Sequence, residues 1–282
     1  MIELRAGRLR CELHPELGAA VAGFWRDEVP LLRSTPAAQL TSARLAGCLA
    51  LVPFSNRVGH ASVLWQGTQL PQVRHGGDPP HAIHGVAWQR PWTVLEQDAA
   101  SAMLAYEHRA DSAWPFAFDC SHTLRLDDHG LELMLALTNQ SGRAAPAGLG
   151  WRPSFAQRPG SRIAFHADAQ WQFDADCLPL RRTPATGLQG DTASLPADAC
   201  FDGWNGVVRI EDDVMRLRLE SALTRLVVGT EAGAFTVAPV SHVPNAVHLH
   251  AAGAATADLG LAVLQPGESL LAQLRLSVEG TT

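Results

Sequence analysis

The chain has 282 residues, 46% of them hydrophobic, so it can bury a large core as one extensive β domain or two smaller ones. Charged residues make up only 18%, and the net charge of -6 provides no positive field for a nucleic acid. The Lys+Arg count of 22 consists entirely of arginine, which excludes Schiff-base chemistry on a lysine.

Targeting and redox features favour a cytoplasmic protein. Residues 1–5 begin an alternating segment without a basic stretch and an apolar run, so we expect no signal peptide. No uninterrupted apolar run is long enough to span a bilayer, so we expect no membrane partner. The cysteines show no metal-binding spacing, and we expect reduced thiols at Cys11, Cys48, Cys120, Cys177 and Cys200.

Alternation of apolar and polar residues predicts β-strands along most of the chain. The clearest segments are 8–13, 62–65, 102–107, 121–126, 131–137, 216–220 and 273–278. Turn residues separate them, and residues 125–133 are typical of a hairpin. One short helix is predicted: residues 37–46 form one or two turns, with Thr35 as cap and Pro36 at the first helical position.

Regularly spaced strands without intervening helices predict an all-β sandwich with more strands than an immunoglobulin domain. The sequence shows no internal repeat and no break in composition, so we expect a single domain over residues 1–282. The Pro/Gly-rich stretch 182–196 is then a surface loop rather than a linker.

Residues 81–92 contain two histidines and two tryptophans in a run with no helical or strand period. Gly85 in this run predicts a close approach or a positive φ. Indoles beside imidazoles suit a pocket for a small polar ring, because indoles cover apolar faces and imidazoles bond hydroxyls or move protons. The alternative is a buried loop whose tryptophans fill the core and whose histidines bond to the backbone.

Four other positions interrupt the strand pattern, and each has a structural alternative. Arg57 can donate to hydroxyls or a carboxylate, or be a solvated surface group. Gly148 and Gly150 flank Leu149 and predict close approach of a backbone or a ligand, or a bulge. Asp198 can accept two hydrogen bonds from vicinal hydroxyls, or cap a turn.

His242 lies in a tail cluster with His248 and His250. The last two have the spacing that shares one face of a strand, but no carboxylate stands nearby, so we expect no metal. A serine hydrolase is excluded because the sequence has neither a G-x-S-x-G elbow nor α/β alternation.

Together these motifs resemble the aldose 1-epimerase (galactose mutarotase) family. The matching segments occur in family order at 52–57, 81–85, 88–92, 114–116, 146–150, 198–201 and 239–243. The resemblance implies a large antiparallel β-supersandwich that holds a monosaccharide. It also implies a reaction in which a carboxylate base and a histidine acid open the sugar ring, so that reclosure gives the other anomer.

The resemblance assigns roles to individual residues. His84 matches the family's first active-site histidine, and we expect it to be the remaining catalytic group. Arg57 matches the substrate-binding arginine, and Asp198 the sugar-binding aspartate. Further substrate contacts are expected from the same motifs at Asn56, Trp88 and His242.

Both proton-transfer positions depart from the family pattern. Arg152 stands where the catalytic histidine is expected, and Ala238 where the catalytic glutamate is expected. Arginine stays protonated and donates well, so Arg152 is predicted as a substrate contact, whereas alanine cannot accept a proton. Whether a group elsewhere, such as His166 or Glu231, replaces the base is left open.

Three functions therefore remain open: an epimerase that uses His84 with His242 or water, a non-catalytic carbohydrate-binding protein, and an enzyme for an anionic sugar. In each, the ligand is a monosaccharide or a sugar acid, no cofactor is needed, and the protein is a monomer or weak homodimer. We expect all the site residues to converge on one patch of the β scaffold.

Overall fold

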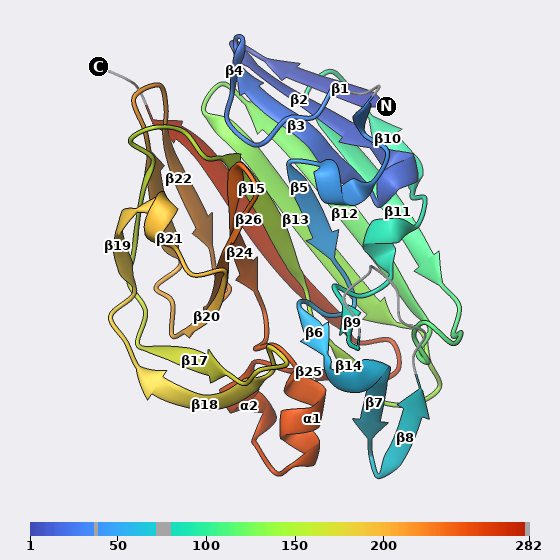
Figure 1. Cartoon of the computed structure of the whole chain (residues 1–282). Helices are drawn as coiled ribbons and strands as arrows, with labels where there is room; N and C mark the ends of the chain where they lie inside the picture. Colours follow the sequence, from blue (N-terminus) through green and yellow to red (C-terminus); the bar gives the residue numbers. More distant parts are fainter. Residues whose placement is uncertain (37–38, 72–79, 280–282) are drawn as a thin grey trace.

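Two large antiparallel β-sheets, packed face to face, make up most of the molecule in the computed structural model, which describes residues 1–36, 39–71 and 80–279 (Figure 1). Every pairing between its named strands is antiparallel within these ranges, and the all-β supersandwich is confirmed. Among the described residues, no helix combines the length and apolar character needed to cross a membrane.

The first sheet has 11 strands in the order β1-β2-β3-β5-β15-β24-β23-β20-β17-β18, with β4 paired to β3. Its strands are β1 Ile2–Ala6, β2 Leu9–His14, β3 Ala20–Arg26, β4 Val29–Pro30, β5 Cys48–Leu51, β15 Gly150–Ala156, β17 Ala169–Phe173, β18 Pro179–Pro184, β20 Asp198–Asp202, β23 Arg225–Glu231 and β24 Ala234–Val240. Strands from the start, middle and end of the chain are therefore neighbours in this sheet.

The second sheet has nine strands in the order β10-β11-β12-β13-β26-β22-β21-β16-β19. They are β10 Thr93–Gln97, β11 Ser101–His108, β12 Phe118–Asp127, β13 Gly130–Asn139, β16 Arg162–Phe165, β19 Leu188–Asp191, β21 Val207–Glu211, β22 Arg216–Ser221 and β26 Ser269–Glu279. The predicted hairpin is confirmed, because Asp127 pairs with Gly130 at the β12–β13 turn.

Short elements gather at one end of the sheets (Figure 1). They are β6 Arg57–Val58 with β9 Ala82–Ile83, β7 Ser62–Trp65 with β8 Thr68–Pro71, β14 Ala145–Ala147 with β25 Ala262–Leu264, and the helices α1 Ala246–Ala251 and α2 Thr256–Leu259. The 3-10 turns are η1 Pro15–Leu17, η3 Ala43–Leu45, η4 Gly59–Ala61, η5 Ala87–Gln89 and η6 Thr192–Ser194.

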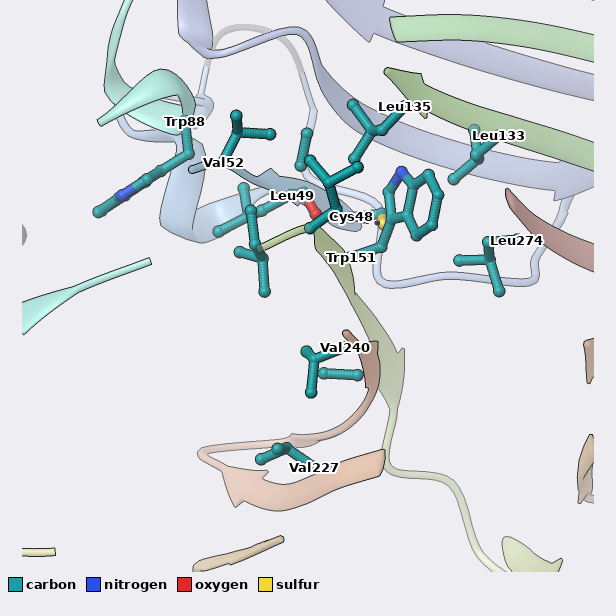
Figure 2. Close-up of a cluster of buried hydrophobic side chains, with 14 of the residues drawn as sticks. Cys48, Leu49, Val52, Trp88, Leu133, Leu135, Trp151, Val227, Val240 and Leu274 are labelled. Carbon is teal, nitrogen blue, oxygen red and sulfur yellow. Dashed lines mark hydrogen bonds between the residues drawn. The ribbon is translucent and has the colours of Figure 1, made fainter. Parts of the chain in front are cut away.

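The alternating sequence pattern produces the core between the two sheets. In β12 and β13, apolar positions are buried and the residues between them are partly exposed. The Trp151 indole of β15 lies beside Leu133, Leu135 and Leu274 of the second sheet (Figure 2), and its Nε1 donates to His122 Nε2 at 3.3 Å. This contact links the sheets and fixes which face of β15 points inward.

Three local predictions were wrong. The helix predicted at 37–46 is not continuous and Thr35 does not cap it. The N–H groups of Gln39 and Leu40 donate to the Pro36 carbonyl, but a separate turn, Ala43–Leu45, is capped by Ser42, and Thr35 donates to the Leu45 carbonyl; residues 37–38 lie outside the described ranges. The stretch 182–196 is no plain loop, because it contains the end of β18, all of β19 and η6. His248 and His250 lie on helix α1, since its backbone forms helical hydrogen bonds, and not on a strand.

Candidate functional site

Arg152 and Ala238 lie on the face of the 11-stranded sheet that points away from the other sheet, called the outer face here. Gly150 pairs with Val240 and Ser154 with Thr236, so Arg152 on β15 stands opposite Ala238 on β24. Trp151, next to Arg152, is fully buried between the sheets, and strand alternation turns Arg152 the other way. The register places Asp198 on this face too, through Gly229 and Thr236.

Arg57 and Asp198 form an ion pair at the edge of the outer face. Arg57 is the first residue of β6, and its Nη1 donates to Asp198 Oδ2 at 2.5 Å across 141 positions of sequence. The side chains are 15% and 25% exposed, so solvent reaches both. The structure thus brings together two predicted sugar contacts, and a guanidinium beside a carboxylate offers donors and acceptors to neighbouring hydroxyls.

His84 is held by the backbone of Asn56. Asn56 N donates to His84 Nδ1 at 3.1 Å, and His84 N donates to the Asn56 carbonyl at 2.9 Å. Since Nδ1 accepts a bond, the neutral ring carries its proton on Nε2, which makes that nitrogen a donor. Asn56 itself is buried, so the described contacts give it the role of orienting His84.

Gly85 lets the 81–92 segment reach the strand that precedes Arg57. Its φ is +73°, and a Cβ there would lie 1.9 Å from the Val52 carbonyl oxygen. The sequence predicted a positive φ or a close approach, and the structure shows both.

The tryptophans and the first histidine of the 81–92 segment serve mainly as core. Trp88 is 2% exposed, its Nε1 donates to the Gly85 carbonyl, and its ring meets the His84 ring edge-on with centroids 6.3 Å apart. His81 accepts from His60 N at 3.1 Å and donates to the Asp176 carbonyl at 2.8 Å. Trp88 therefore backs His84 from the protein side.

His242 is bonded through both ring nitrogens to the backbone. Ser55 N donates to its Nε2 at 3.1 Å, and its Nδ1 donates to the Val243 carbonyl at 2.7 Å. Burial lowers the pKa of His242 to about 4. A Cβ on Gly148 would lie 2.0 Å from the His242 ring, so the close approach at Gly148 is to a side chain and not to the backbone or ligand that was predicted. The described contacts give His242 the role of bracing the 52–58 segment.

Arg152 meets a partner that the sequence did not assign to it. Its Nη2 donates to Glu231 Oε1, and Arg33 Nη1 donates to Glu231 Oε2 at 2.8 Å. Burial opposes the charged form of Glu231, but the two guanidinium groups outweigh it and hold its pKa below the usual value. His166, the other group considered as a base, is an exposed residue just after β16 of the second sheet.

The histidines of the tail cluster are also occupied. His248 Nε2 bonds to the Ser62 carbonyl and His250 Nδ1 to the Ala254 carbonyl. Within the part of the chain that the structure describes, no group of three or more His, Cys, Asp or Glu residues is arranged to hold a metal ion.

Comparison with known proteins identifies the family and the fold. The family model for aldose 1-epimerase matches residues 1–277. The uncharacterised protein YphB of Escherichia coli K12 is 30% identical over 98% of this chain and 98% of its own. A provisionally assigned aldose 1-epimerase of E. coli K12, solved by crystallography, has 28% identity, a TM-score of 0.86 and 98% coverage of both chains.

A galactose mutarotase-like protein from Clostridium acetobutylicum shares the fold, with a TM-score of 0.84, 19% identity, and coverage of 99% of this chain and 95% of that one. The chain belongs to the aldose 1-epimerase family, as the motifs predicted. Family and fold together support a carbohydrate epimerase or mutarotase function.

Proposed function

We propose that this protein is a carbohydrate isomerase that binds a monosaccharide over the Arg57–Asp198 pair and interconverts its anomers by ring opening. The observation that carries the proposal is the ion pair itself, joined at 2.5 Å from segments 141 positions apart and still accessible to solvent. Such a pair, next in the sequence to the Asn56 that orients His84, matches the alternating donors and acceptors of a sugar ring.

The predicted contacts then divide into two roles. Arg57, Asp198 and the Nε2 of His84 bind hydroxyls or the ring oxygen, whereas Asn56, Trp88 and His242 hold the binding groups in place. We propose that His84 acts in the reaction as a hydrogen-bond donor to the sugar, since the Asn56 N–H occupies its other nitrogen.

Polarimetry on freshly dissolved α-glucose and α-galactose tests this proposal. We expect the wild-type protein to accelerate the decay of optical rotation, and Asp198→Asn to lower kcat/KM by about 10- to 100-fold, since a hydrogen bond to a charged group contributes about 1.5–3 kcal/mol. Asp27→Asn is the control, because it breaks an exposed ion pair with Arg8 that is not part of the candidate site. This variant should leave the rate unchanged. Rates equal to buffer for every sugar would refute catalysis.

One observation favours a non-catalytic carbohydrate-binding protein as the second candidate. Arg152 and Ala238 face each other where the resemblance places the acid and the base. In that case sugars raise the melting temperature without changing optical decay, and Arg152→His with Ala238→Glu should create mutarotase activity.

A sugar acid belongs in the same set of ligands. Arg33 and Arg152 share a single carboxylate, so this cluster carries one excess positive charge in a chain whose net charge is -6. The polarimetric panel therefore includes galacturonate beside the neutral sugars.

A further inference from the structure

The outer face lacks a carboxylate at Ala238 of β24, but the neighbouring strand β23 carries one, Glu231. On β23, Val227 pairs with Ala238, Gly229 with Thr236, and Glu231 with Ala234. Residues two apart on a strand point to the same side, so Glu231 shares the outer face with Arg152 and Asp198. We propose that Arg152 and Glu231 act together as the donor and the acceptor that open the sugar ring, an inference that rests on the proposed function.

Small side chains line the path between Glu231 and the position of Ala238. Gly229 has no side chain, and a Cβ there would lie 2.8 Å from the Ala197 carbonyl oxygen. Ser154 and Thr236 are its neighbours on the adjoining strands, and both are buried. Neither β23 nor β24 thus places a large side chain between Glu231 and Ala238, so the Arg152 side chain, which begins opposite Ala238, can extend to Glu231.

Glu231 is held as a charged, oriented acceptor. One oxygen accepts from Arg152 and the other from Arg33, whose own backbone N–H donates to the Ser154 carbonyl at 2.7 Å. The side chains of Arg152 and Glu231 are 23% and 26% exposed, so substrate can reach them. Each carboxylate oxygen has a second lone pair, and a guanidinium has five N–H donors, so the ion pair can persist while both partners contact a ligand.

The geometry of the pair matches the reacting atoms. The ring oxygen and the C1 hydroxyl of a cyclic sugar are both bonded to C1, so an acceptor and a donor must lie side by side, as they do in an arginine–carboxylate pair. Glu231 takes the proton of the C1 hydroxyl, the electrons of that O–H bond form the C1=O bond, and the bond from C1 to the ring oxygen breaks.

The electron pair of the broken bond remains on the ring oxygen, where the Arg152 guanidinium stabilises the negative charge until a water molecule supplies a proton. After rotation about the C1–C2 bond, the ring hydroxyl returns its proton to solvent and attacks C1, and the carbonyl oxygen recovers the proton held by Glu231. No proton is gained or lost over the cycle, and no other reactant is needed.

Replacing Glu231 tests the inference on the full-length protein with α-galactose and α-glucose. Glu231→Gln keeps the shape and can still accept from Arg152, but it cannot take a proton. We expect kcat to fall by about 100-fold or more, the usual contribution of a general base, while the rise in melting temperature caused by the sugar persists. The matched control is Glu12→Gln on β2 of the same sheet, where Glu12 pairs with Arg10 and is 20% exposed.

Glu231→Asp is a second variant for the case in which Glu231→Gln fails to fold. It keeps the negative charge and shortens the side chain by one methylene. It should lose at least about tenfold in kcat with sugar binding unchanged. If the wild-type protein catalyses mutarotation and both Glu231 variants keep a kcat near the wild-type value, this inference is overturned and the proposed function stands. A wild-type rate equal to buffer would overturn both.

The pH profile of the native protein gives an independent readout. The charged groups that contact Glu231 are Arg33 and Arg152, which keep its pKa below the usual 4.5. With Glu231 as base, the enzymatic rate at pH 5 should remain within about twofold of the rate at pH 7. A loss of more than about tenfold over this range would indicate a base with the ordinary histidine pKa and contradict the inference.

Discussion

His122 and His242 are two buried side chains that remain uncharged near neutral pH. Burial lowers the pKa of each to about 4, whereas an exposed histidine has a pKa of 6.5. His122 accepts from the Trp151 indole between the sheets, and His242 accepts from Ser55 N beside the candidate site. Charging either ring would therefore break a hydrogen bond as well as place a charge in the interior.

This burial predicts how stability depends on pH. In the unfolded chain these histidines become protonated below pH 6.5, whereas in the folded chain they stay neutral down to about pH 4. The free energy of unfolding should therefore fall as the pH decreases from 6.5 to 4. The loss approaches about 3 kcal/mol for each histidine at the acid end. Urea denaturation at pH 7.5, 6 and 5 measures it, and His122→Asn should reduce the slope.

The exposed His166 provides the comparison, because His166→Gln should leave the pH dependence unchanged. A free energy of unfolding that stays constant between pH 7 and pH 5 would contradict the neutral assignment of the two buried rings.

Single residues of the site differ in how far the sequence could reveal them. Arg57, His84 and Asp198 stand in motifs that resemble a family, so roles could be proposed for them without coordinates. The contact between Arg152 and Glu231 could not be predicted, because it depends on the register of β15, β24 and β23, and the sequence left His166 and Glu231 as alternative replacements for the base. Proton placement on His84 and His242 required the hydrogen bonds from residues 55 and 56.

The segment 81–92 shows what one element of the chain contributes. Its glycine was predicted correctly because an aperiodic run of bulky residues needs one position without a Cβ. Its tryptophans were compatible with a binding surface or a core, and only the burial of Trp88 and Trp92 decides between these readings. The strands were predictable from alternation, whereas 182–196 lacked an alternating pattern strong enough to reveal β19.

Gly85→Ala tests the fit of this segment, and Gly67→Ala is its matched control. Both glycines have φ above +70°, so each alanine incurs about 1 kcal/mol for the left-handed conformation. Gly67 has nothing within 4 Å of its added Cβ, whereas the Cβ at Gly85 would lie 1.9 Å from the Val52 oxygen. We expect a total loss of about 3 kcal/mol or more at Gly85, and a loss of sugar binding through the displaced His84.

Chemical denaturation of the two variants measures the difference. Equal midpoints for Gly85→Ala and Gly67→Ala would show that the backbone at Val52 moves aside freely, and would remove the structural reason for the glycine.

The whole molecule joins distant parts of the chain through its sheets. β5 pairs with β15, β15 with β24, and β13 with β26, so each of the two large sheets joins strands that are far apart in the sequence. Alternation predicted that strands exist but could not give their order, because pairing across long separations leaves no local signal; the family resemblance supplied the fold class. We propose that residues 1–282 form one domain on the strength of these pairings.

At this scale the central claim is that the outer face of the 11-stranded sheet holds a monosaccharide. A crystal structure of the protein soaked with the sugar that gives the largest rise in melting temperature tests it most directly. We predict hydroxyl oxygens within hydrogen-bond distance of Arg57, His84 and Asp198, with C1 facing Arg152 and Glu231. A sugar bound at another surface, with Asp198 still paired only to Arg57, would contradict the claim.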